Sequence, residues 1–294
     1  MSPNASQLSA LSRLFSPGVF REISQKGQSA LFARLFSQTG IVGRSNQTVA
    51  DAFDAAFAIL RRAGYRDEYV YRAALTQNVL LGTHSLNSAS MLTEFRAGSC
   101  KADLAILNGT ATVYEIKSER DSLTRLENQI NNYKKVFAKI YVIAGEAHVN
   151  SVLSNTPLDI GVMCLNRRSH ISKIREAVDR SESVCPITIF ESLRADEARS
   201  ILNDLGVIVP DVPNTILRST MRDCYAQLAP KDVHHAMVRT LKRTRSLAPL
   251  SEFIERLPLS LRPIALSVQI RNTVQQQRFI EAVSLPLIKA MDWK

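Results

Sequence analysis

The chain of 294 residues lacks the features that mark secreted and membrane proteins. Its four cysteines are widely spaced and form no CxxC pair, which argues against both a disulfide framework and a zinc site. No uncharged apolar run reaches the roughly 18 residues that a membrane span needs. The N-terminal segment has no early basic stretch followed by a long apolar one, so it does not resemble a secretory signal. These absences predict a soluble, reduced, cytoplasmic protein that does not act in a membrane.

Glycine and proline are also scarce, at 11 residues each, which excludes collagen-like and low-complexity sequences. The apolar fraction of 45% argues against a wholly disordered chain. Acidic residues are also few. The chain has 27 Asp and Glu and 37 Lys and Arg, which gives a net charge of +10. Such a charge suggests a polyanionic partner, with nucleic acid as the main candidate. The alternative is that the protein is merely basic, as many proteins are, and charge alone does not exclude it.

Apolar spacing divides the chain into three regions. Residues 1–62 have apolar residues at helical spacing, and residues 184–294 again have this spacing, in segments separated by prolines. Between them, residues 63–183 alternate helical and strand-like segments, with a hairpin turn at Asn108-Gly109. The order predicts an α/β fold with a mixed central sheet flanked by helices, plus helical regions at both ends. The expected helices are 66–81, 121–137 and 148–153, and the expected strands are 91–95, 102–107, 112–116, 140–144 and 160–165.

Three charged residues are expected to meet at one end of this hairpin. Asp103 opens one strand, whereas Glu115 and Lys117 close the next, so the turn brings them to the same end. Glu115 and Lys117 differ by two positions and therefore share one face of the sheet. Carboxylates together with water are suitable ligands for Mg²⁺, and a neighbouring lysine can position an attacking water. The alternative is a surface hairpin with a cross-strand ion pair, and the spacing alone leaves both possibilities open.

The residues that follow the hairpin extend its charged residues into a pattern that resembles a known family. Gln129 and Tyr133 extend the D…ExK pattern with a Q-x-x-x-Y helix, and together they resemble the PD-(D/E)XK nuclease superfamily. The segments YRxEY at 65–69, TEFR at 93–96, KADLAILNG at 101–109 and YEIKS at 114–118 look like a bacterial branch of it. The specific part covers residues 65–145, and the residue before Asp103 is Ala102 rather than the proline that names the superfamily. The resemblance implies a restriction-endonuclease-like core over 63–183.

The resemblance also implies roles for individual residues. Asp103, Glu115 and the carbonyl of Ile116 would hold Mg²⁺, for which Mn²⁺ could substitute, and Lys117 would orient the attacking water. Gln129 and Tyr133 would support the site or touch the phosphate. A further acid would complete the metal site, and two residues compete for this role. Glu68 could instead stabilise the N-terminus of its helix, and Glu94 could instead be an ordinary charge on an edge strand.

Contacts to the nucleic-acid backbone are expected from side chains beside this site, although each has a simpler explanation as a solvated side chain, a helix cap or a packing residue. Two further basic runs, at 167–175 and 239–245, are either solvated faces or backbone clamps. The expected contact residues are Lys101, Arg96, Ser118, Arg125 and Tyr133.

The sequence therefore predicts a metal-dependent nuclease that hydrolyses phosphodiester bonds, with DNA as the favoured substrate and RNA not excluded. The alternative is a non-catalytic module that keeps the fold and binds nucleic acid or a protein partner. Cutting both strands of a duplex with a single-site fold usually needs two copies, so a homodimer is also expected.

Overall fold

The computed structural model describes residues 3–44, 46–62 and 64–294, and the chain divides into two compact units. The first, here called the helical unit, comprises Met1–Thr83, Arg167–His170 and Leu247–Lys294. The second, here called the sheet unit, comprises His84–Asn166 and Ile171–Ser246. The sequence region expected at 184–294 is thus shared between the two units.

The helical unit is built from both ends of the chain. Gln47 O accepts a hydrogen bond from Leu287 N at 2.8 Å, and Val49 N donates to Leu285 O at 3.0 Å. Aromatic contacts of Phe20 with Phe279 join α2 to α15 in the same unit. Its elements are α1 (Ala5–Leu14), α2 (Pro17–Lys26), α3 (Ala30–Gln38), α4 (Val49–Leu60), α5 (Glu68–Leu75), the π-helical segment η1 (Thr76–Leu80), α6 (Leu81–Thr83), the 3₁₀ turn η3 (Ala248–Leu250), α13 (Ser251–Glu255), α14 (Arg262–Val268), α15 (Thr273–Ser284) and α16 (Leu287–Ala290).

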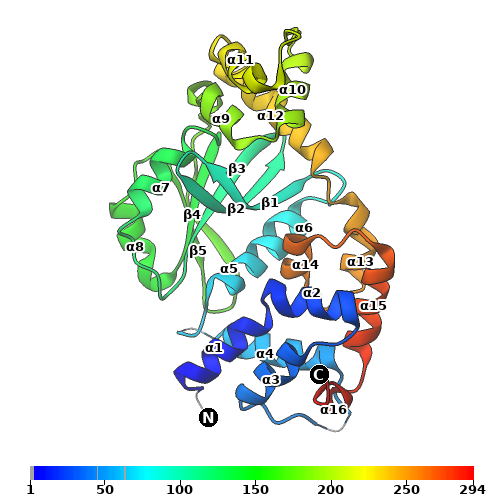
Figure 1. Cartoon of the computed structure of the whole chain (residues 1–294). Coiled ribbons are helices and arrows are strands. Elements are labelled where there is room, and N and C mark those ends of the chain that lie inside the picture. Colours follow the sequence, from blue (N-terminus) through cyan, green and yellow to red (C-terminus); the bar gives the residue numbers. More distant parts are fainter. Residues whose placement is uncertain (1–2, 45, 63) are drawn as a thin grey trace. The chain divides into compact units, whose positions relative to one another are not determined.

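The sheet unit contains a six-stranded mixed sheet in the order β1-β2-β3-β4-β5-β6 (Figure 1). The first three strands form an antiparallel meander, β3, β4 and β5 are parallel, and β6 returns antiparallel to β5. The strands are β1 (Ser90–Ala97), β2 (Cys100–Asn108), β3 (Thr110–Lys117), β4 (Lys139–Gly145), β5 (Gly161–Leu165) and β6 (Ile171–Arg175). The helices are α7 (Leu126–Tyr133), α8 (Glu146–Ser154), the 3₁₀ turn η2 (Ser181–Ser183), α9 (Pro186–Ser192), α10 (Ala195–Asp204), α11 (Asn214–Ala226) and α12 (Pro230–Thr244).

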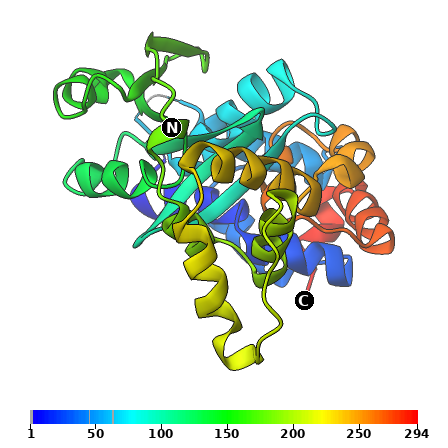
Figure 2. The same ribbon diagram turned by 90° about the horizontal axis from the view of Figure 1, so that it is seen from above.

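One face of the sheet carries both the core of this unit and the expected site. Residues alternate between the two faces of a strand, so Glu115 and Lys117 lie on the same face of β3 as the buried Ala111 and Val113. These two apolar residues pack in one cluster with side chains of α7 and of α9 to α12. The helix α7 also packs against β2, while α12 contacts β2 and β3 and crosses the sheet in Figure 2.

The mixed α/β fold, the meander and the helical regions at both ends of the sequence confirm the sequence prediction. The helix expected at 121–137 is wrong in length, because the regular helix spans only Leu126–Tyr133. Asp121 Oδ2 accepts a hydrogen bond from Ser118 N at 2.8 Å and closes a turn, so neither residue caps that helix. The strand β6 was not predicted, because its sequence ISKIR is largely exposed and carries no buried apolar alternation.

A separate expectation concerned the membrane. Among the described residues, no helix has the length and apolar character required to cross a bilayer.

Candidate functional site

The centre of the site is an ion pair buried at the end of β3. Glu115 is 1% exposed and Lys117 is 4% exposed. Lys117 Nζ donates to Glu115 Oε1 at 2.9 Å and to Gln129 Oε1 at 2.8 Å. Charged groups of this kind are rarely buried unless they are paired and hydrogen-bonded. The structure therefore brings together three of the residues expected from the sequence, from β3 and α7.

The helix α7 supplies a second contact to the same pair. Tyr133 lies one turn after Gln129, on the same face of α7. Its hydroxyl is 2.7 Å from Glu115 Oε2 and 2.9 Å from the carbonyl oxygen of Lys101. Burial, followed by the negative charge of Glu115, raises the pKa of Tyr133 well above its usual range, so the phenol remains a hydrogen-bond donor. The resemblance implies that Tyr133 either supports the site or touches the phosphate, and these contacts match the first of the two roles.

Asp103 lies beside this pair on the adjacent strand. The register of the hairpin pairs Leu104 with Tyr114, so the next position brings Asp103 opposite Glu115. Asp103 Oδ2 accepts a hydrogen bond from the backbone nitrogen of Ile116 at 2.8 Å. The expected convergence of Asp103 with Glu115 and Lys117 at one end of the hairpin is therefore present.

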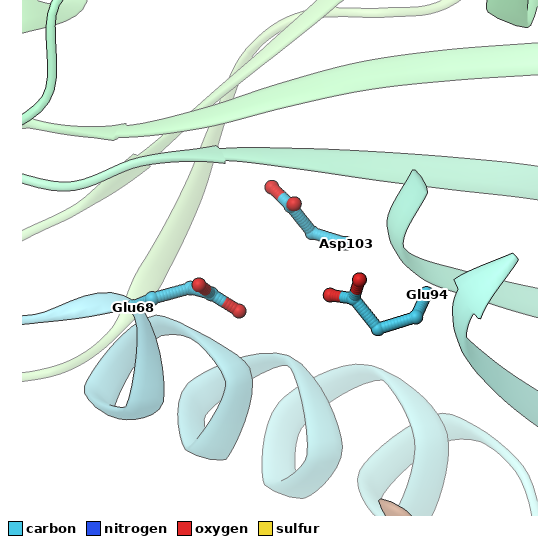
Figure 3. A group of neighbouring side chains, drawn as sticks. All are labelled: Glu68, Glu94 and Asp103. Atoms are coloured by element: carbon cyan, nitrogen blue, oxygen red, sulfur yellow. The ribbon is translucent and has the colours of Figure 1, made fainter. Parts of the chain in front are cut away.

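Glu94 brings a third carboxylate from the edge strand. Thr93 pairs with Leu104 and Phe95 with Ala102, which places Glu94 opposite Asp103 across β1 and β2. Its backbone has a φ of 53°, in the left-handed region that glutamate rarely adopts. Carboxylate oxygens of Glu94 and Asp103 lie within 4.8 Å of each other, and Figure 3 shows both side chains extending from neighbouring strands toward the same space.

The donor set fits a hard divalent cation. Carboxylate oxygens are the ligands that Mg²⁺ prefers, at about 2.1 Å from the ion, and a small movement would let Glu94 and Asp103 share one. Glu115 already contacts Lys117 and Tyr133, yet a carboxylate has about four acceptor positions, so these contacts do not exhaust it. Water can complete the coordination of Mg²⁺.

Glu68, also labelled in Figure 3, belongs to the helical unit. It is the first residue of α5, after the helix cap Asp67, whose side chain accepts a hydrogen bond from Val70 N. Its carboxylate pairs with Arg72 one turn later. The position of Glu68 in the first turn and its ion pair with Arg72 match the alternative for this residue, a charge at the N-terminus of its helix.

The remaining expected residues surround the hairpin end. Lys101 and Arg96 are exposed on the β1–β2 hairpin, and Arg96 Nε donates to Gly98 O at 3.3 Å. Arg125 is exposed directly before α7, whereas Ser118 is buried at the start of the turn closed by Asp121. The two arginines and Lys101 are thus open to solvent, and the side chain of Ser118 is not.

One residue that positions the site was not predicted. Asn132 is 7% exposed on α7, and its Oδ1 accepts a hydrogen bond from Ser99 N at 3.1 Å. A side chain on Gly98 would clash with this amide, and Gly98 has a φ of 59°. Asn132 therefore fixes the tight β1–β2 turn against the helix that carries Gln129 and Tyr133. Only the glycine in the turn could have signalled this contact in the sequence.

Comparison with known proteins gives three findings. The family model described as Bacteriophage P4 protein cII matches residues 61–260. Protein cII of Enterobacteria phage P4 is 28% identical over 182 residues, which cover 58% of this chain and 65% of the phage protein. The chain thus spans slightly less than two thirds of that relative's length. A solved structure, the SPO1766 protein of unknown function from Silicibacter pomeroyi, is 16% identical with a TM-score of 0.28, over 40% of this chain and 80% of that one. That likeness is too weak to support an argument.

Proposed function

We propose a metal-dependent nuclease function for this chain, which belongs to the Bacteriophage P4 protein cII family. The observation that carries the proposal is the buried Lys117, held between Glu115 and Gln129 beside the carboxylates of Asp103 and Glu94. An ammonium group at the edge of an acidic cluster matches the arrangement that the PD-(D/E)XK resemblance implies. A purely structural ion pair would account for Glu115 and Lys117 but not for two additional carboxylates that approach one another.

Each residue has a role in this mechanism. Asp103 and Glu94 would hold Mg²⁺ or Mn²⁺, with Glu115 and the carbonyl of Ile116 as the further ligands. The bound cation would supply positive charge at the phosphate and a more acidic water. Lys117 orients the attacking water or stabilises the charge that develops on the phosphate oxygens. Gln129 holds the ammonium of Lys117, and Tyr133 holds the second oxygen of Glu115.

The substrate class follows from charge. The net charge of +10 favours a polyanion, and exposed Lys101 and Arg96 stand on the hairpin that also carries Asp103 and Glu94. These two side chains would contact the backbone phosphates beside the scissile bond. The favoured substrate is DNA, with RNA as the comparison in the experiment.

The direct test is cleavage of supercoiled plasmid, linear duplex, single-stranded DNA and RNA in the presence of Mg²⁺ or Mn²⁺. The key variant is Asp103→Asn, because the amide oxygen can still accept the hydrogen bond from Ile116 while the negative charge is lost. Lys117→Met tests the ammonium, and circular dichroism shows whether it still folds. The matched controls are Glu127→Gln, an exposed acid on α7, and Lys289→Met, an exposed lysine in α16.

We expect metal-dependent cleavage by the wild type and the controls, with losses of at least about 100-fold in Asp103→Asn and folded Lys117→Met. No cleavage by the wild type with either metal, or equal cleavage by Asp103→Asn, would exclude the nuclease. DNA binding without cleavage would instead support the non-catalytic module.

A further inference from the structure

The helical unit contains a cavity that the proposed nuclease mechanism does not use. Its volume is about 200 Å³. One wall comes from the end of α4, a second from α5 and η1, and a third from residues 168–170. The lining residues are Phe57, Arg61, Val70, Ala73, Ala74, Gln77, Asn78, Arg168, Ser169 and His170.

The lining combines an apolar wall with positive charge. Phe57, Val70, Ala73 and Ala74 supply the apolar part of the lining, and each is only 2% to 8% exposed. Arg61 and Arg168 supply guanidinium groups, and none of the described residues that line the cavity is acidic. Guanidinium groups pair bidentately with phosphate oxygens, and an aromatic ring offers a surface on which a base can stack. The combination suits a ligand that has both a flat apolar part and an anionic part.

Hydrogen bonds fix the walls of the cavity relative to one another. Arg66 is 1% exposed, and its guanidinium donates to Arg61 O and to Arg167 O, both at 3.0 Å. Arg61 Nε lies 3.4 Å from Ser169 Oγ. A buried arginine thus joins the end of α4 to the segment that carries Arg168. The cavity is therefore a built feature of this unit.

The amides of η1 add a preference for one kind of base. Gln77 Nε2 donates to Leu259 O at 3.3 Å, and Asn78 Nδ2 donates to Ala74 O at 2.8 Å. Each amide nitrogen uses one of its two N–H groups in this way, and the amide oxygen of each side chain would be the acceptor for an exocyclic amino group of the base. Both residues lie in a π-helical segment, a distortion that often occurs at functional sites.

We propose that this cavity binds a nucleoside monophosphate, either free in solution or as the phosphorylated end of a strand. The base lies against Phe57 and Val70, and the phosphate meets Arg61 and Arg168. The volume is below the roughly 300 Å³ at which pockets that enclose a whole drug-sized ligand begin, so the cavity would enclose only the base, with the sugar and the phosphate at its rim. The inference goes beyond the proposed nuclease function and does not depend on it.

The test uses isothermal titration of the full chain with deoxyadenosine monophosphate, deoxythymidine monophosphate, deoxyadenosine and inorganic phosphate. A single-stranded oligonucleotide with and without a 5′-phosphate distinguishes a strand end from the free nucleotide. Arg61→Gln and Arg168→Gln remove the two cations, and Arg44→Gln is the control because Arg44 is exposed in the same unit and outside the cavity.

We expect deoxyadenosine monophosphate to bind at one site, about tenfold more tightly than either the nucleoside or phosphate alone, and to be preferred over deoxythymidine monophosphate. Each cavity variant should weaken binding about tenfold, since each removes one charge-assisted contact, and Arg44→Gln should not. No saturable binding, or binding unaffected by both cavity variants, would overturn the proposal. Asp103→Asn should bind the nucleotide like the wild type, which separates this result from that of the nuclease test.

Discussion

Tyr133 has a role that can be tested by removing a single atom. Its hydroxyl contacts Glu115 Oε2, and its raised pKa keeps it protonated through the alkaline range, so it acts only as a donor. Tyr133→Phe should lower the cleavage rate about tenfold, because Oε2 of the buried Glu115 then lacks its hydrogen-bond donor. The defect should have the same size at every pH from about 6 to 9, since the pKa of Tyr133 lies above this range.

The matched control for this variant is Tyr225→Phe. Tyr225 is also buried in the sheet unit, and its hydroxyl donates to Ala198 O at 3.1 Å. The two variants should lose similar stability in urea unfolding, whereas only Tyr133→Phe should lose activity. Equal rates for the two variants would assign Tyr133 to packing alone.

Glu94 gives a prediction about backbone strain. A non-glycine residue with a φ of 53° is held in a costly conformation, and such strain often occurs at functional sites. Glu94→Gly should therefore raise the free energy of unfolding by up to about 1 kcal/mol, since glycine adopts this φ freely. The same variant should need a higher Mg²⁺ concentration for cleavage, because one carboxylate is missing.

Thermal unfolding and a Mg²⁺ titration of the cleavage rate check this prediction, with Glu68→Gln measured beside it. If Glu94 is the additional metal ligand, Glu94→Gly shifts the Mg²⁺ dependence and Glu68→Gln does not. The reverse pattern would assign that role to Glu68, and an unchanged dependence in both would exclude both acids.

At the scale of elements, the hairpin was predictable because its signals are local. Asn108-Gly109 is a turn sequence, Gly109 has a φ of 70°, and the turn sets the register that aligns Asp103 with Glu115. The contacts that orient the site are not local, since Tyr133 and Asn132 reach back over 18 and 33 residues to Glu115 and Ser99. The resemblance supplied Gln129 and Tyr133, while no pattern in the chain indicated the π-helical segment or the φ of Glu94.

The helix α12 gives a prediction about pH. His234 on α12 is fully buried, its Nε2 accepts a hydrogen bond from Ala111 N at 3.4 Å, and its neighbours include His235 and Asp179. Burial, with a smaller effect of His235, lowers the pKa of His234 from 6.5 to about 4. Between pH 4 and pH 6.5, His234 is therefore protonated in the unfolded chain but neutral in the folded chain. Stability is complete above pH 6.5 and decreases as the pH falls toward 4, by about 3 kcal/mol in total.

Urea unfolding of the wild type and of His234→Gln at a series of pH values measures this effect. The glutamine oxygen can still accept from Ala111 N, so the variant should fold and should have a flatter dependence between pH 6.5 and 4. His148→Gln is the control, because it makes the same replacement at a half-buried histidine of the same unit. Identical curves for the wild type and His234→Gln would contradict the assignment.

At the scale of the whole chain, no sequence pattern indicated which regions assemble into one unit. The helices at 1–62 and those after 247 form one unit, joined by contacts such as Phe20 with Phe279. Neither apolar periodicity nor proline spacing reports on pairs so far apart in the chain. The sequence likewise reports the positive charge only as a net value. The structure shows which basic side chains lie beside the acidic site.

That placement leads to a prediction about salt. If Lys101 and Arg96 contact phosphates, binding of DNA should weaken as salt rises, and each lost contact should reduce the slope of log K against log salt by about 0.9. The variant Lys101→Gln with Arg96→Gln, made with Asp103→Asn to prevent cleavage, should therefore lower the slope by about 2. The control pair Arg21→Gln with Lys26→Gln, exposed on α2 and made in the same Asp103→Asn background, lowers the net charge by the same two units. Fluorescence anisotropy at several salt concentrations measures both slopes. If only the Lys101 and Arg96 variant lowers the slope of log K against log salt, the DNA backbone lies beside Asp103. If both variants lower the slope equally, the effect comes from net charge and not from these two contacts.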